Sequence, residues 1–228
     1  MKKVGSWYLP DNEVHFVTQL EAKGVDGYQV TNRKTMLDAY AKLDDYKTAL
    51  AVDIGANVGF WTRDLCRVFD RVVAYEPIDF NIECLRENCV SEKLNIVGKA
   101  LSNRKGTTTM WSTDGESGAP SMYREHFNQA NEFTVETRLL DDEVESWSEE
   151  ERRNCFIKLD VQGHEQQVLE GGSTYLKEYG PAICIEFRAN KEVTPGWIKW
   201  FKQRNYRLNA QFKKEHLFIP EGRDNLHR

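Results

Sequence analysis

The stretch AVDIGANVGFWTRDL, from Ala51 to Leu65, decides the fold. Its first residues are apolar and predict a buried strand, and its last residues predict an amphipathic helix. The turn between them contains Gly55, Asn57 and Gly59. Glycine lets a backbone turn sharply, and the free N–H groups at the start of the next helix favour an anionic group. The stretch therefore predicts a ligand-binding turn at the carboxyl end of a strand.

The alternation of strand and helix continues along the chain. The helix after the turn is expected to bury Trp61, Leu65, Val68 and Phe69, which recur at helical spacing. Further strands are predicted at residues 71–77, 94–100, 107–112, 132–138, 155–160 and 182–187, with a closing hairpin at residues 206–220. Strands separated by helices indicate an α/β domain with a mostly parallel sheet and right-handed crossovers.

Carboxylates stand at or next to the ends of four predicted strands, namely Asp53, Glu76, Asp160 and Glu186. Ligands of parallel sheets bind outside the carboxyl ends of the strands, so these side chains are expected to meet at one site. A carboxylate that ends the second strand, as Glu76 does, can accept hydrogen bonds from both hydroxyls of a ribose.

The turn does not match the phosphate-binding patterns. A dinucleotide site requires G-x-G-x-x-G, whereas Gly55 and Gly59 form G-x-x-x-G, and no Gly-Lys-Ser/Thr follows a longer loop. A ligand with a ribose, an adenine and a small carboxylate fits better, and S-adenosylmethionine has these parts. Two alternatives remain open here: an NAD(P)-dependent oxidoreductase on a similar sheet, and a non-catalytic cofactor-binding module.

Five segments together resemble the FkbM-type S-adenosylmethionine-dependent methyltransferases. They are VDIGANVGFWT, AYEP, GKALSNRKG, FIKLDVQGHEQQVLEGG and AICIEF, and they span about residues 50–190. The resemblance implies the class I methyltransferase fold, a Rossmann-like three-layer α/β sandwich. Its seven-stranded sheet is mostly parallel, with one antiparallel strand.

The resemblance also implies a set of cofactor-binding residues at the strand ends. They are Asp53, Gly55, Asn57 and Gly59 for the methionyl part, Glu76, followed by Pro77, for the ribose, Ala100, Leu101 and Ser102 for the adenine, and Asp160 for the amino group or the substrate. Members of this family mostly methylate hydroxyls, often on sugars or small metabolites. A small-molecule or carbohydrate hydroxyl is therefore the expected acceptor.

An alcohol is a poor nucleophile, so a base is expected to take its proton during transfer. Asp160 and His164 are the candidates for that base, and Glu186 is expected to orient the substrate. These three side chains could instead hold Mg²⁺, although no spacing in the sequence is diagnostic of a metal.

Composition bounds the remaining expectations. The 228 residues suit one domain, with a core at residues 49–220 and an extension at residues 1–48. A net charge of -5 without a basic cluster argues against a nucleic-acid partner. No apolar run indicates a secretory signal or a membrane span, so a cytoplasmic location is expected. The five cysteines, none in a C-x-x-C pair, are expected to be buried and reduced.

Overall fold

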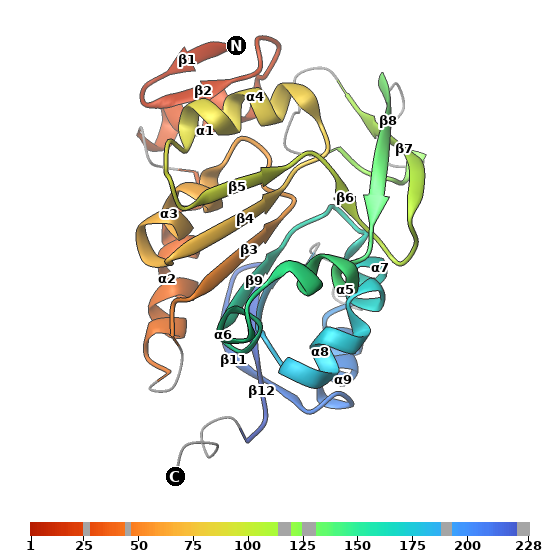
Figure 1. Ribbon diagram of the computed structural model, residues 1–228. Helices are drawn as coiled ribbons and strands as arrows, with labels where there is room; N and C mark the ends of the chain where they lie inside the picture. Colours follow the sequence, from red (N-terminus) through yellow and green to blue (C-terminus); the bar gives the residue numbers. More distant parts are fainter. Residues whose placement is uncertain (25–27, 44–46, 114–119, 125–130, 188–192, 223–228) are drawn as a thin grey trace.

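A seven-stranded β-sheet runs through the centre of the protein and carries the strand ends that form the site (Figure 1). The computed structural model describes residues 1–24, 28–43, 47–113, 120–124, 131–187 and 193–222. Across the sheet the strands are, in order, β11 (Tyr206–Phe212), β12 (Glu215–Pro220), β10 (Ala182–Glu186), β9 (Cys155–Leu159), β3 (Leu50–Ile54), β4 (Arg71–Tyr75) and β5 (Leu94–Val97).

Strands β10, β9, β3, β4 and β5 run parallel, and β12 runs antiparallel to both of its neighbours. The predicted fold, a mostly parallel sheet with one antiparallel strand, is therefore confirmed. The chain moves outward from β3 through β4 to β5 and then returns to the other side of β3 as β9. Such a reversal of strand order opens a crevice at the carboxyl ends of the central strands.

Helices cover both faces of the sheet, which gives three layers (Figure 1). One face packs against α2 (Val30–Ala41), α3 (Phe60–Val68) and α4 (Asp79–Asn88). The other packs against α5 (Leu140–Glu143), α7 (Glu165–Gly171), α8 (Ser173–Tyr179) and α9 (Val193–Lys202). A short 3-10 turn (Val144–Ser146) and α6 (Glu149–Arg153) connect α5 to β9.

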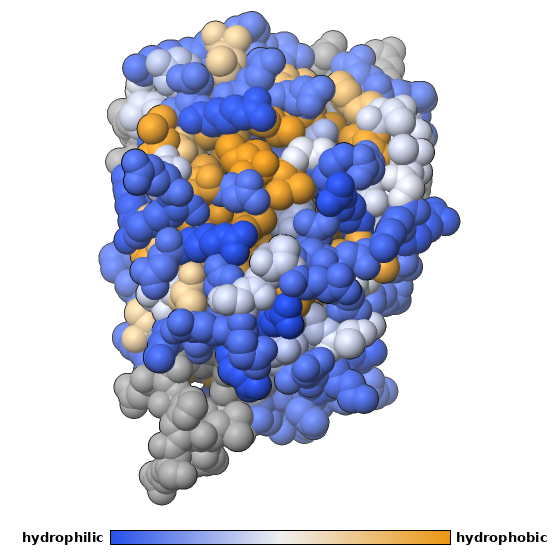
Figure 2. Space-filling view, viewed as in Figure 1, coloured by the Kyte–Doolittle hydropathy of each residue, from blue (hydrophilic) through white to orange (hydrophobic). Residues whose placement is uncertain are grey.

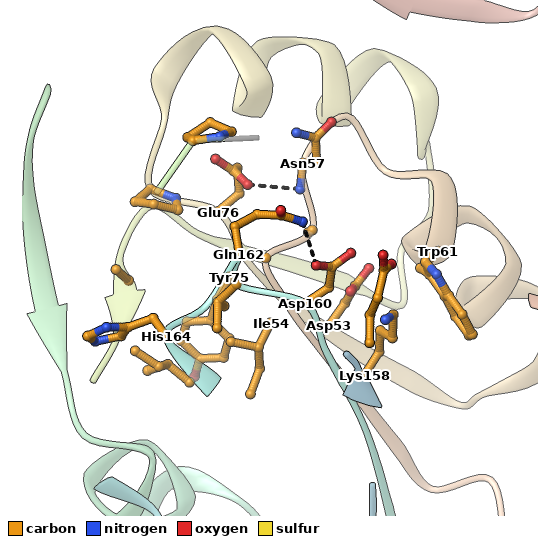
Figure 3. A pocket seen from close by; sticks show the side chains of 18 of the residues that line it. Asp53, Ile54, Asn57, Trp61, Tyr75, Glu76, Lys158, Asp160, Gln162 and His164 are labelled. Atoms are coloured by element: carbon orange, nitrogen blue, oxygen red, sulfur yellow. Dashed lines mark hydrogen bonds between the residues drawn. The ribbon is translucent and has the colours of Figure 1, made fainter. Parts of the chain in front are cut away.

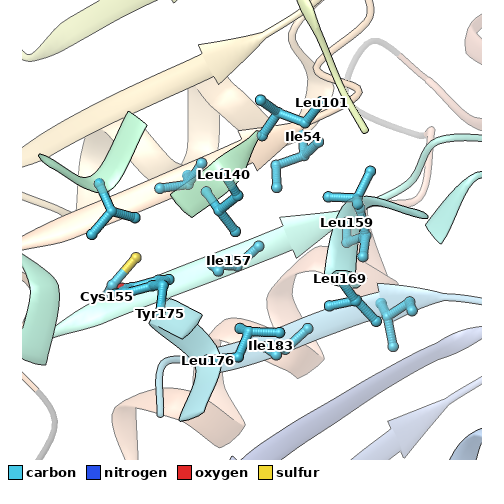
Figure 4. Close-up of a cluster of buried hydrophobic side chains, with 14 of the residues drawn as sticks. Ile54, Leu101, Leu140, Cys155, Ile157, Leu159, Leu169, Tyr175, Leu176 and Ile183 are labelled. Atoms are coloured by element: carbon cyan, nitrogen blue, oxygen red, sulfur yellow. The ribbon is translucent and has the colours of Figure 1, made fainter. Parts of the chain in front are cut away.

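Strand β9 shows how the two halves of the core arise. Ile157 and Leu159 point to one face and pack with Leu176 of α8 in the larger apolar cluster (Figure 4). Phe156 points to the opposite face, toward α2 and α3, because successive side chains of a strand alternate. Interior strands of a parallel sheet are usually apolar throughout. Lys158, which shares the face of Phe156, is the exception.

A second sheet stands beside the first, with β6 (Ala100–Leu101) next to β8 (Asn131–Arg138) and β8 next to β7 (Gly106–Ser112). The prediction of one strand over residues 94–100 is wrong. The N–H of Lys99 donates to the carbonyl of Val97 at 2.9 Å, so a tight turn ends β5 and sends β6 into the second sheet.

The prediction that Val68 is buried is also wrong, since it is the last residue of α3 and is 39% exposed. Trp61, Leu65 and Phe69 are buried as expected. All five cysteines are free, and all except the half-buried Cys66 are buried.

The N-terminal extension forms the hairpin β1 (Lys2–Val4) and β2 (Trp7–Leu9), followed by α1 (His15–Lys23) and α2. The side chain of Asn88 in α4 fixes this hairpin, because it accepts from the N–H of Tyr8 at 2.7 Å and donates to its carbonyl at 2.8 Å. Polar side chains cover most of the face seen in Figure 2, while apolar ones gather over α4 and β5. Within the described ranges no helix has the length and apolar character to cross a membrane.

Candidate functional site

A cavity of about 110 Å³ opens at the carboxyl ends of β3, β4, β9 and β10 (Figure 3). Most of the sequence-predicted site residues line it, namely Asp53, Gly55, Asn57, Glu76, Pro77, Ala100, Leu101, Asp160, His164 and Glu186. Gly59 and Ser102 lie outside this lining.

The two glycines of the turn after β3 are needed for packing of the chain. Gly55 has φ +83°, and a Cβ on it would lie 2.0 Å from the carbonyl oxygen of Asp160. Gly59 precedes α3 with φ +96°, and a Cβ there would meet Leu85 and the Sγ of Cys89, each at 2.6 Å. The turn can therefore approach β9 and α4 closely only with glycine at both positions.

Asn57 forms the tip of this turn, with φ 52°. Its side-chain oxygen accepts from the N–H of Val58 at 2.7 Å, and its own N–H donates to Glu76 at 2.8 Å. Asparagine tolerates the left-handed conformation better than most residues. The turn and the end of β4 are thus joined directly at the rim of the cavity.

Glu76 is buried, and its two carboxylate oxygens point to different donors. Oε2 accepts from the N–H of Asn57, and Oε1 accepts from the N–H of Ile78 at 3.0 Å and the side-chain amide of Asn81 at 3.3 Å. Burial raises the pKa of Glu76 to about 7 against the opposing effect of these hydrogen bonds. A carboxylate has about four lone-pair sites, so Glu76 retains capacity for a ligand hydroxyl.

Asp53 lies deeper, below the turn. Its Oδ2 accepts from the hydroxyl of Thr62 on α3 at 2.6 Å. Burial raises its pKa to about 6, and Lys158 and the hydrogen bond from Thr62 oppose that rise. Asp53 is therefore partly or fully ionised at neutral pH and adds negative charge to the floor of the cavity.

Asp160 and Glu186 form an acidic pair at the ends of β9 and β10. Gln162, with φ 54°, donates from Nε2 to Oδ1 of Asp160 at 2.8 Å. Gln29 donates from Nε2 to Glu186 at 3.3 Å, and Lys214 lies 3.9 Å from the other oxygen of that carboxylate. Burial and then the neighbouring Glu186 carboxylate raise the pKa of Asp160 well above its usual range.

His164 lies away from this pair, on the far side of Gln162 (Figure 3). Its Nε2 is 2.9 Å from the hydroxyl of Ser102. Burial lowers the pKa of His164 to about 4, so the imidazole is neutral at physiological pH. Ser102, although outside the main cavity, lines a second hollow together with His164.

The loop after β9 is built for this geometry. The carboxylate of Glu165 accepts from the N–H groups of Val161 and Gly163 at 3.3 and 3.1 Å, which closes the turn that presents Asp160 and Gln162. A Cβ on Gly171 would lie 2.0 Å from the carbonyl of Ser102. Part of the segment FIKLDVQGHEQQVLEGG, which contains both Glu165 and Gly171, therefore serves packing.

Several residues of the cavity were missed in the sequence. Phe16, Tyr28 and Phe60 form an aromatic wall, with ring centroids 4.7 to 5.0 Å apart. No signal in the N-terminal extension indicated this contribution. The sequence could have indicated Lys158, since a charged residue is unusual in an apolar strand that is buried on both sides.

Arg33 of the extension is buried and does not line the cavity. It donates to Asp64 at 2.7 Å and to the carbonyl of Tyr28. It thereby fixes the segment that carries the aromatic wall.

The proposed Mg²⁺ ligand set receives no geometric support. Across the described residues, no group of three or more His, Cys, Asp or Glu side chains is arranged to hold a metal ion. Asp160 and Glu186 lie together, but His164 points toward Ser102.

The model of the methyltransferase FkbM domain matches residues 53–208. A methyltransferase FkbM from Methylobacillus flagellatus KT shares 16% identity with a TM-score of 0.56, and the match covers 82% of this chain and 47% of that one. This chain therefore spans about half the length of that protein. This likeness supports the fold.

Two further solved structures are similar at lower scores. A putative RNA methyltransferase from Pyrococcus horikoshii has 11% identity and a TM-score of 0.47, covering 83% of this chain and 84% of that one. A magnesium protoporphyrin IX methyltransferase from Synechocystis PCC 6803, solved with bound SAM, has 10% identity and a TM-score of 0.49, covering 93% and 87%. Among curated proteins none matches the sequence.

Proposed function

Because the chain belongs to the methyltransferase FkbM family, we propose that it transfers a methyl group from S-adenosylmethionine to a hydroxyl of a sugar or small metabolite. Family membership implies the cofactor, and the hydroxyl acceptor is the proposal. The observation that carries it is the pair of carboxylates, Asp160 and Glu186, which line the same cavity as Glu76.

The residues of the cavity fit the cofactor. Asp53, Glu76 and Asp160 provide carboxylates where a ligand with a sulfonium and an ammonium group needs negative charge. Glu76 is proposed to accept from the ribose hydroxyls, and Ala100 and Leu101 to contact the adenine. When bound, the cofactor supplies a methyl group on a positively charged sulfur, which an oxygen nucleophile displaces.

Asp160 is proposed to act as the base. Burial and the neighbouring Glu186 carboxylate raise the pKa of Asp160 well above its usual range, which makes its carboxylate a stronger base than an exposed aspartate. The proton of the acceptor hydroxyl passes to a carboxylate oxygen of Asp160. Glu186 and the amide of Gln29, 3.3 Å apart, orient the acceptor. His164 is proposed to support the loop after β9 and the part of the cavity that would hold the adenine.

The aromatic wall supports a ring-shaped acceptor. Tyr28 and Phe16 line the same cavity as the acidic pair, and aromatic rings beside carboxylates provide both apolar contact and hydrogen-bond acceptors. A sugar has one apolar ring face and several hydroxyls, so it matches this arrangement.

A labelling screen tests the proposed function. Methyl-labelled S-adenosylmethionine is incubated with glycans, nucleotide sugars and small metabolites, and products are identified by mass spectrometry. We expect O-methylation that Asp160→Asn lowers by about 10²-fold or more, while the affinity for S-adenosylhomocysteine changes much less. Equal losses of affinity and turnover would contradict a catalytic role for Asp160. Binding of NADH in place of S-adenosylhomocysteine would favour an oxidoreductase.

A further inference from the structure

Lys158 lies at the base of the cavity, on β9, two residues before Asp160 (Figure 3). Lys158 is 1% exposed, and its Nζ has no hydrogen-bond partner among the residues the structure describes. The ring of Trp61 lies 5.0 Å from that nitrogen. A buried ammonium that loses water without gaining hydrogen bonds is strongly disfavoured. Its charge must therefore be compensated by other groups.

Carboxylates surround this ammonium on several strands. Asp53 on β3 and Cys184 on β10 are its register partners in the sheet, and Glu215 on β12 is the partner of Glu186. The titratable groups described around Lys158 are Asp53, Asp160, Cys184, Glu186 and Glu215. On the packed helices, Thr62 of α3 is bonded to Asp53, Asn32 of α2 is bonded to Glu215 at 3.0 Å, and the buried Arg33 of α2 is paired with Asp64 of α3.

One buried cation thus faces several acids, and a second, exposed cation, Lys214, lies 3.9 Å from Glu186. Burial lowers the pKa of Lys158, but the surrounding carboxylates, Asp160 first among them, outweigh that effect and raise it. The ammonium therefore remains charged. The Glu186 carboxylate favours the neutral form of Asp160 and the Lys158 ammonium favours its ionised form, so the charge state of Asp160 depends on this ammonium.

We propose that Lys158 is a positioning residue for methyl transfer, whose charge favours the ionised form of Asp160 and so keeps that carboxylate available to accept the proton of the acceptor. This inference rests on the proposed role of Asp160 as the base. Lys158 keeps its own proton throughout. Without it, the neutral form of Asp160 is favoured further, and its carboxylate is less available as a base at neutral pH.

The pH profile of kcat/KM tests this inference with Lys158→Met. The acidic limb is expected to move to higher pH by about 1–3 units, so activity falls at pH 7 and recovers in alkaline buffer. Lys158→Arg restores the charge and should keep the wild-type limb. Lys34→Met, at an exposed lysine of α2 that pairs with Asp38, is the matched control and should change nothing.

Calorimetry gives a readout that does not depend on turnover. Binding of S-adenosylmethionine is measured at pH 7 in buffers of different ionisation enthalpy, which counts the protons released. Lys158→Met is expected to release up to one proton more than the wild type, because the cationic ligand expels a proton from the carboxyl group of Asp160. S-adenosylhomocysteine, which lacks the sulfonium charge, should release fewer protons from the variant.

An unchanged acidic limb, an unchanged proton count, or a loss of activity that is uniform across pH would each overturn the role of Lys158. If Lys158→Met does not fold, Lys158→Gln takes its place. Glu186→Gln tests the pair independently, since removal of the like charge must move the acidic limb to lower pH. If no acceptor is methylated but the proton counts change as expected, the proposed function fails and the coupling of Lys158 to the pair stands.

Discussion

Replacing Glu76 by alanine separates two tasks of this carboxylate. In the structure its oxygens accept from the N–H groups of Asn57 and Ile78 and from the amide of Asn81. In the proposed complex they also accept from the ribose. Glu76→Ala therefore removes internal hydrogen bonds and a ligand contact at once, and each loss has its own measurement.

The loss of stability follows from the three donors. A buried donor left without a partner costs about 1–3 kcal/mol, and water entering from the cavity replaces part of what is lost. The free energy of unfolding should therefore fall by about 2–4 kcal/mol. For a chain of this length the Tm should fall by about 5–15 °C, as measured by thermal unfolding without cofactor.

The loss of affinity follows from the ribose. A hydrogen bond to a charged group contributes about 1.5–3 kcal/mol, and the acceptor site that remains on Glu76 is proposed to take one from the ribose. Binding of S-adenosylhomocysteine should weaken by about 10- to 100-fold, since 1.4 kcal/mol is a factor of ten. Titration calorimetry below the Tm of the variant measures this change.

Asn81→Ala is the control, because it removes one donor to Glu76 but keeps the carboxylate. It should lower the Tm and leave the affinity much closer to that of the wild type. If Glu76→Ala bound S-adenosylhomocysteine as tightly as the wild type, the assignment of the ribose to Glu76 would be wrong. A loss of affinity of equal size in both variants would instead indicate a general disturbance of the turn.

Three further outcomes are expected. Gly55→Ala should lower the free energy of unfolding by about 2–5 kcal/mol, since its Cβ would lie 2.0 Å from Asp160; a Tm within 2 °C of the wild type, a margin taken as roughly 1 kcal/mol, would contradict this. Ser148→Ala, which removes a capping box, should cost about 1 kcal/mol and leave cofactor affinity unchanged, as thermal unfolding and calorimetry would show. The raised pKa values of Asp53 and Glu76, about 6 and 7, add stability at low pH that is lost as pH rises through them. The Tm without cofactor should therefore fall from pH 5 to pH 8 while affinity for cationic S-adenosylmethionine rises, and a flat profile of both would refute this.

The central sheet was predictable because its signals are local. The strand, turn and helix around Gly55 follow from apolar runs and glycine spacing, and β3, β9, β10 and the closing hairpin all lie where they were predicted. The cofactor side of the candidate site was largely predictable for the same reason. Strand ends of a parallel sheet meet at one edge, so residues such as Asp53, Glu76 and Asp160 converge without knowledge of distant contacts.

The acceptor side was not predictable, because tertiary contacts decide it. Tyr28 reaches the cavity only because Arg33 bonds to its carbonyl and to Asp64 of α3. His164 turns toward Ser102 because the second sheet brings β6 beside α7. No local sequence pattern indicates either of these contacts. The role of Lys158 was predictable only in part. The sequence showed a charged residue in an apolar strand, but it did not show the carboxylates that three other strands bring close to it.

The two halves of the cavity have different origins in the chain, and this has an evolutionary consequence. The central sheet builds the donor half, while the aromatic wall is contributed largely by the extension before residue 48, which Asn88 fastens to α4. If the aromatic wall contacts the acceptor as proposed, substitution within this segment alters which acceptor fits without disturbing the sheet frame proposed to hold the methyl donor. Exchange of the segment between homologous proteins is then a route by which acceptor preference diversifies on a constant scaffold.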